Sequence, residues 1–90
     1  MKVKDGLILR YVDGVAVVVA VGETSRTFHG MIRLNASGVI LWETLAGGVQ
    51  SADALTDALC AHYAVSRETA AADVAAFLSA LADAGLLEES

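Results

Sequence analysis

The fold of this chain is decided by a stretch that reads Met31-Ile32-Arg33-Leu34-Asn35-Ala36-Ser37-Gly38-Val39-Ile40-Leu41-Trp42. Its apolar beginning predicts a short strand that ends at Leu34. A helix is expected to begin immediately afterwards with Asn35 as its N-cap and Ser37 as the less favoured alternative, because either side chain can accept a hydrogen bond from a free backbone N–H of the first helical turn. Apolar residues occupy nearly every side of this helix over residues 36–45, so we expect it to be central and buried.

The part of the chain before this helix predicts three strands. Residues 7–12 and 15–21 are rich in apolar and β-branched side chains, and Asp13-Gly14 between them favours a type I′ hairpin turn. The returning strand is apolar on both faces, so we expect both faces to be covered. After a loop over residues 22–26, a third strand is expected over residues 27–34, with His29 alone on it.

The part after it predicts two more helices. Ser51 and Ser66 are placed as their N-caps, and Gly85 is placed to end the second, with Leu86 making the accompanying hydrophobic contact. The apolar stripes consist of Leu55, Ala58, Leu59 and Tyr63 in the first of these helices and of Ala70, Val74, Phe77, Leu78 and Leu81 in the second. Strands followed by helices predict one α+β domain over residues 1–90, winged-helix-like, with a three-stranded antiparallel sheet packed on three helices.

Composition and charge restrict the function. The chain is 56% hydrophobic, yet no apolar run approaches the roughly 20 residues that cross a bilayer. The N-terminus makes a poor signal peptide and Cys60 is the only cysteine, so the sequence predicts a cytoplasmic protein with no membrane partner. Residues 1–34 carry a net charge of +2, whereas residues 35–90 carry one basic and eight acidic residues, a net charge of −7. An acidic helical half would be repelled by phosphates, so no nucleic-acid partner is expected.

No pattern in the sequence predicts catalysis. Cys60 and His62 are two residues apart on one predicted helix and therefore point to different sides. Two histidines and one cysteine at these spacings match no zinc pattern, and the glycines form neither a dinucleotide fingerprint nor a P-loop. We expect no catalytic residue, no metal and no cofactor.

Instead, the third strand and the last helix are expected to frame a groove that could hold an extended peptide. Asp73 borders the apolar stripe of that helix, either as a polar contact to a peptide or strand edge or as an ordinary solvated flank. Arg33 is either a contact for an acidic ligand residue or a solvent-facing residue that discourages aggregation at a sheet edge. Trp42, on so apolar a helix, is expected in the core.

The order of several motifs resembles the PqqD family, named for pyrroloquinoline quinone biosynthesis protein D. The motifs are Leu34-Asn35-Ala36-Ser37-Gly38 with Ile40-Leu41-Trp42 and Leu45, then Tyr63, Val65 and Ser66, and finally Asp73-Val74, Phe77-Leu78, Leu81 and Gly85-Leu86-Leu87. The resemblance covers the whole chain. It implies a winged-helix-like recognition element for ribosomally synthesised and modified peptides, which binds the leader segment of a precursor and presents its core to a modifying enzyme, often a radical S-adenosylmethionine (SAM) protein.

The resemblance also implies where the leader binds. In the family, the leader adds as a strand to the edge of the third strand and lies against the third helix. On this chain the implied peptide contacts are Gly30, Met31, Ile32, Arg33, Leu34, Ala70, Asp73, Val74, Phe77, Leu78 and Leu81. Similar domains serve many pathways, lasso peptides among them, so the resemblance does not specify the quinone cofactor.

Two other interpretations remain open at the level of the sequence. A winged-helix domain can bind nucleic acid, although the acidic helical half argues against it. A structural module that forms a homodimer is the other, because a doubly apolar strand or an exposed strand edge can pair with a second copy.

Overall fold

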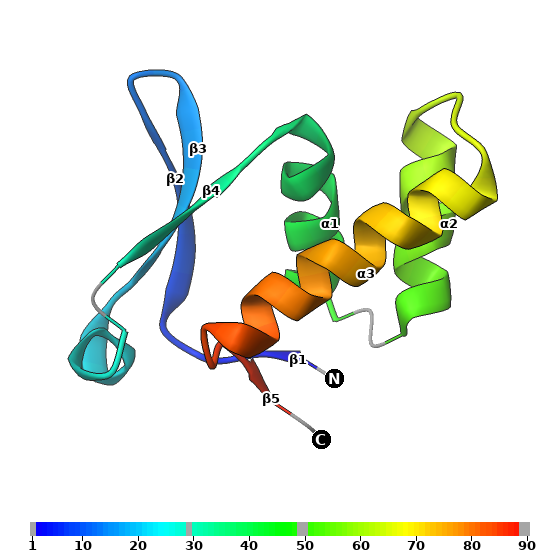
Figure 1. The fold of residues 1–90 in the computed structure, drawn as a ribbon. Coiled ribbons are helices and arrows are strands. Elements are labelled where there is room, and N and C mark those ends of the chain that lie inside the picture. Colours follow the sequence, from blue (N-terminus) through cyan, green and yellow to red (C-terminus); the bar gives the residue numbers. More distant parts are fainter. Residues whose placement is uncertain (1, 29, 49–50, 89–90) are drawn as a thin grey trace.

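The computed structural model describes residues 2–28, 30–48 and 51–88, in which a three-stranded sheet lies beside three helices (Figure 1). The elements in chain order are β1 (Lys2–Val3), β2 (Leu7–Val12), β3 (Val15–Ala20), the 3₁₀ helix η1 (Gly22–Arg26), β4 (Met31–Leu34), α1 (Ala36–Ala46), α2 (Ala52–His62), α3 (Arg67–Asp83) and β5 (Leu87–Glu88). This arrangement confirms the predicted α+β, winged-helix-like fold.

The sheet has the order β2-β3-β4 and is antiparallel throughout. Asp13 and Gly14 have φ values of 52° and 80°, which confirms a turn of the predicted type because both central residues of a type I′ turn need positive φ. Strand β3 pairs with β4 from Ala16 opposite Leu34 to Val19 opposite Met31. Within the described residues β4 has only this one partner, so its other edge is open.

The predicted third strand was too long, because residues 27 and 28 follow directly on η1 and precede the start of β4. The backbone N–H groups of Thr27 and Phe28 both donate to the carbonyl of Thr24, at 3.1 and 3.0 Å. The η1 segment is itself fixed to the start of β2, where the Val21 N–H donates to the Gly6 carbonyl at 2.7 Å. Strand β3 ends at Ala20, and β4 begins only at Met31. His29 lies outside the described residues.

The helix ends follow the predicted capping residues. The side chain of Asn35 accepts from the Gly38 N–H at 2.8 Å, and Ser51 and Ser66 cap α2 and α3 in the same way. At the other end of α3, the Leu86 N–H donates to the Leu81 carbonyl and the Gly85 N–H to the Ala82 carbonyl. With Gly85 at φ 74°, these two bonds form a Schellman motif, and Leu86 is buried as predicted.

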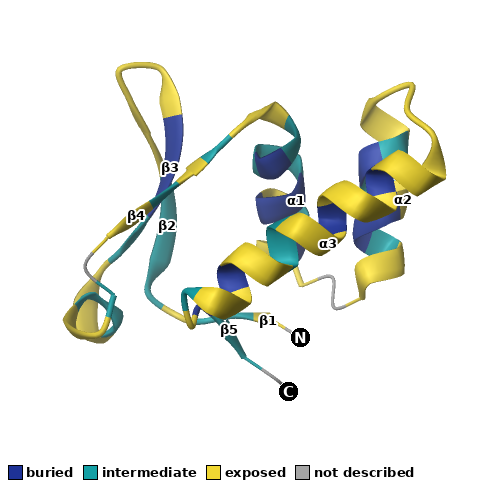
Figure 2. Cartoon of the chain, in the orientation of Figure 1, coloured by how far each residue is buried: buried dark blue, intermediate teal, exposed yellow. Residues whose placement is uncertain are grey.

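The core lies between the helices and one face of the sheet (Figure 2). Its buried members are Val18, Leu41, Trp42, Leu45, Leu55, Leu59, Ala70, Val74, Leu81 and Leu86. Two expectations were wrong in part. Tyr63 is 36% exposed because it ends α2, and β3 is covered on both faces only at its centre, since Val15 is 43% exposed.

Two features join distant parts of the chain, and neither was predicted. Strands β1 and β5 pair antiparallel, with Lys2 opposite Glu88 and Val3 opposite Leu87.

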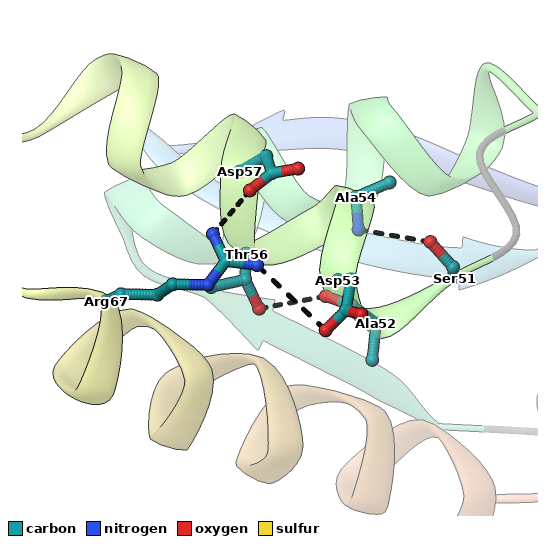
Figure 3. A network of polar contacts seen from close by, with 7 residues as sticks. All are labelled: Ser51, Ala52, Asp53, Ala54, Thr56, Asp57 and Arg67. Atoms are coloured by element: carbon teal, nitrogen blue, oxygen red, sulfur yellow. Dashed lines mark hydrogen bonds and ion pairs between the residues drawn. The ribbon is translucent and has the colours of Figure 1, made fainter.

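Arg67, at the start of α3, pairs with Asp57 on α2, and its guanidinium lies 3.9 Å from the carboxylate oxygen Oδ1 of Asp53 on the same helix (Figure 3). The hydrogen bond and negative charge of Asp57 raise the pKa of Arg67. Arg67 is the one Lys or Arg in residues 35–90, and its positive charge is already paired with Asp57 within that half.

Candidate functional site

A groove of about 610 Å³ runs between the β4 side of the sheet and α3. The sheet contributes Val15, Ile32, Arg33 and Leu34, the start of α1 contributes Asn35, Ser37, Gly38 and Leu41, and α3 contributes Asp73, Ala76, Phe77, Ala80 and Leu81. Most of these side chains are apolar, so the groove offers a surface for burying apolar groups with a few polar contacts at its margins.

One wall of the groove is the open edge of β4. Ile32 and Leu34 pack against the core and line the groove, because alternate residues of a strand face the same side. Met31 is 57% exposed, and Arg33 is also exposed. An edge strand presents a row of unpaired backbone N–H and C=O groups, which an extended chain can join as a further strand.

The opposite wall is one face of α3. Asp73, Ala76, Phe77 and Ala80 are spaced i, i+3, i+4 and i+7, which places them on one side of the helix. Ala76 and Ala80 are exposed and small, so a backbone can approach the helix closely there. Neither residue was among the predicted contacts, although their spacing from Asp73 was a signal for this face.

The predicted contacts on α3 divide between two faces of the helix. Asp73, Phe77 and Leu81 line the groove. Ala70 and Val74 have relative exposures of 0% and 1% and lie in the core, and Leu78 packs against that core without lining the groove. Ala70, Val74 and Leu78 therefore lie behind the groove wall. The apolar stripe predicted from the sequence corresponds mainly to the face of α3 that packs on the core.

The predicted contacts on the strand also divide. Ile32, Arg33 and Leu34 line the groove, whereas Gly30 and Met31 line a second hollow of about 450 Å³. This hollow lies beside η1 and the end of β3, and its other members are Val19, Ala20, Ser25 and Phe28. The two hollows thus adjoin the two ends of β4.

The strand and the helix that line the groove each contribute one charged residue, and the two charges have opposite signs. Arg33 belongs to β4 and Asp73 to α3, and neither takes part in any ion pair or side-chain hydrogen bond found in the described ranges. Both charges therefore remain available to a bound molecule.

Cys60 and His62 do not line the groove. No group of three or more His, Cys, Asp or Glu side chains among residues 2–28, 30–48 and 51–88 could hold a metal ion. His62 bonds through Nδ1 to the Ala58 carbonyl, and Cys60 is half-buried against the core. In the same ranges, no helix is long and apolar enough to span a membrane.

Comparisons with known proteins place this geometry in a family. A structure of TbiB1 in complex with the TbiA(beta) leader peptide has a TM-score of 0.77 and 32% identity, with 100% of this chain and 98% of that chain covered. A structure of lasso peptide synthetase B1 complexed with the leader peptide has a TM-score of 0.72 and 22% identity, over 98% of this chain and 96% of that chain, and shows the same fold. A comparison with curated proteins gives no significant match. The family model described as coenzyme PQQ synthesis protein D matches residues 7–87, and the chain therefore belongs to the PqqD family.

Proposed function

We propose that this protein binds the leader segment of a ribosomally synthesised precursor peptide and presents the peptide to a modifying enzyme. The leader adds as a strand to the open edge of β4 and lies against α3. The observation that supports this most directly is the groove itself, which joins an unpaired strand edge to a largely apolar helix wall. Strand addition takes its affinity from main-chain hydrogen bonds and its specificity from pockets for alternate side chains, and it needs no catalytic group.

The proposed contacts follow from the lining of the groove. Ile32, Arg33 and Leu34 provide the strand, with Gly30 and Met31 extending it toward the second hollow, and Asp73, Ala76, Phe77, Ala80 and Leu81 provide the helix wall. The relative at 32% identity was solved with a leader peptide, which supports the same class of ligand here.

The remaining parts of the proposal concern the partner and the setting. The protein acts as a non-catalytic accessory, and a radical SAM protein is the enzyme class that we propose as the recipient of the peptide. We place both in the cytoplasm. We propose no nucleic-acid role, because residues 35–90 carry a net charge of −7 and their one basic side chain is paired with acidic residues.

Backbone amide NMR of the labelled protein tests the proposal. The probes are the leader segments of precursor peptides encoded beside its gene and the TbiA(beta) leader, with duplex DNA as the control. We expect chemical-shift changes in β4 and on the groove face of α3 with at least one leader. Saturable changes with DNA alone, or none with any leader, would overturn the proposal.

A further inference from the structure

We infer that the groove selects a leader segment in which an acidic residue stands between two apolar residues. The same segment carries a basic residue that is an even number of positions from each of these apolar residues. This inference rests on the proposed function and specifies the chemistry of its ligand. It follows from the register of the sheet, from the two faces of β4 and from the charges of Arg33 and Asp73, which form no ion pair with another residue that the structure describes.

The register decides on which side of the sheet Arg33 lies. Arg33 is opposite Val17, and Val17 is opposite Arg10 on the other neighbouring strand, so the three residues share one sheet face. Ile32 and Leu34 have the opposite orientation and pack toward the helices. Val17 is only 2% exposed although it lies on the face away from the helices. Arg10 and Arg33 flank Val17 on this face, and long cationic side chains can cover apolar neighbours with their aliphatic parts while their charged ends stay in water.

An added strand continues this alternation. The residue opposite Arg33 directs its side chain to the same face as Arg33, about 4.5–5.5 Å away between Cβ atoms. A carboxylate is the complement of the guanidinium at that position. The residues on either side of it stand opposite Ile32 and Leu34 and therefore point into the groove, where apolar side chains are favoured. This apolar–acidic–apolar triplet reads the same in both directions, so it does not depend on whether the leader runs parallel or antiparallel to β4.

The helix wall adds the basic residue. Side chains that point into the groove meet Phe77 and the small residues Ala76 and Ala80, which leave room for bulk, and also the carboxylate of Asp73. Alternate residues of the bound peptide share a face. The basic residue that pairs with Asp73 therefore occupies another peptide position whose side chain points into the groove, two or four residues from an apolar member of the triplet. Among the described residues neither Arg33 nor Asp73 takes part in an ion pair or a side-chain hydrogen bond, so a peptide charge would displace no partner found there.

A displayed library of twelve-residue peptides with randomised central positions tests this selection. We expect the wild-type protein to enrich Asp or Glu between two apolar residues, with a Lys or Arg at an even spacing. Arg33→Glu is expected to replace the acidic preference by a basic one, and Asp73→Lys to reverse the preference at the even-spaced position. For individual peptides, replacing the acidic residue by Gln is expected to weaken binding about two- to five-fold, the effect of one exposed cross-strand ion pair.

Arg10→Glu is the matched control. Arg10 shares the sheet face and the neighbour Val17 with Arg33 but lies on β2, away from the open edge of β4. Its reversal is expected to leave the selected sequences unchanged. Two outcomes would overturn this inference and leave the proposed function intact. In the first, peptides shift the amide signals of β4 and α3, but the library shows no charge preference. In the second, the charge preference changes in Arg10→Glu instead of in Arg33→Glu. A library from which no peptide is retained would overturn both.

Discussion

Asn35 caps the start of α1 directly after β4, because its side-chain Oδ1 accepts a hydrogen bond from the backbone N–H of Gly38 at 2.8 Å. Strand β4 ends one residue before Asn35 and α1 begins one residue after it. Asn35 and Gly38 both line the groove, so this hydrogen bond lies where the edge strand passes into the first helix.

Replacing this cap is expected to lower stability. Asn35→Ala removes the acceptor and should reduce the free energy of unfolding by about 1 kcal/mol, within a range of roughly 0.5–2 kcal/mol for such caps. Chemical denaturation followed by circular dichroism measures the change. Asn35→Asp is the control, because Asp caps equally well; an equal loss in both variants would contradict the capping role.

The groove face of α3 can be tested by one substitution placed at two sites. Ala76→Arg puts a long side chain into the groove and is expected to weaken leader binding at least ten-fold. Ala75→Arg places the same side chain on an exposed position that does not line the groove, and binding should not change. Both are surface substitutions, for which stability is expected to change by no more than about 0.5 kcal/mol. Equal binding by the two variants, measured by calorimetry, would argue against the groove.

Val74 and Phe77 should separate stability from binding. Val74→Ala removes buried methyl groups and is expected to cost about 2 kcal/mol of stability while leaving the leader affinity of the folded protein unchanged. Phe77 is half-buried and lines the groove, so Phe77→Ala should cost less than the roughly 3–5 kcal/mol of a fully buried Phe and should weaken binding. Val74→Glu is unsuitable as a test of binding, because a carboxylate at a position with 1% exposure is expected to unfold the protein. A large loss of affinity in Val74→Ala would show that the assignment of faces is wrong.

Two glycines with positive φ should respond differently to alanine. An added Cβ at Gly6 would lie 2.7 Å from the Val21 carbonyl oxygen, whereas nothing lies within 4 Å of one at Gly14. Gly14→Ala is therefore expected to cost only the conformational penalty, roughly 1–2 kcal/mol, and Gly6→Ala distinctly more. Thermal unfolding of the two variants compares them; similar losses would mean that the contact between Gly6 and Val21 adjusts freely.

Local signals predicted much of the fold. Asp13-Gly14, the three capping residues and Gly85 each act through their nearest neighbours, and each took the predicted role. The pairing of β1 with β5 depends on contacts between residues far apart in sequence, which no local pattern encodes.

The groove was predicted less completely, and α3 shows why. Alanines occur on several sides of this helix, and Ala is compatible both with a packed core, as at Ala70, and with an exposed wall, as at Ala76. Spacing alone therefore indicated a helix but not which of two adjacent faces meets the core. Only the position of α3 against α1 and β4 decides which face is buried in the core and which face lines the groove.

The pairing of β1 with β5 has a mechanical consequence. Because Lys2 stands opposite Glu88 at the outer end of a two-residue ladder, tension applied to these two residues separates the strands one pair at a time. Such an opening resembles a zipper and requires little force. A load transmitted through the two ends of the described chain would thus be relieved at this ladder first, before it reached the helices and the sheet that enclose the groove.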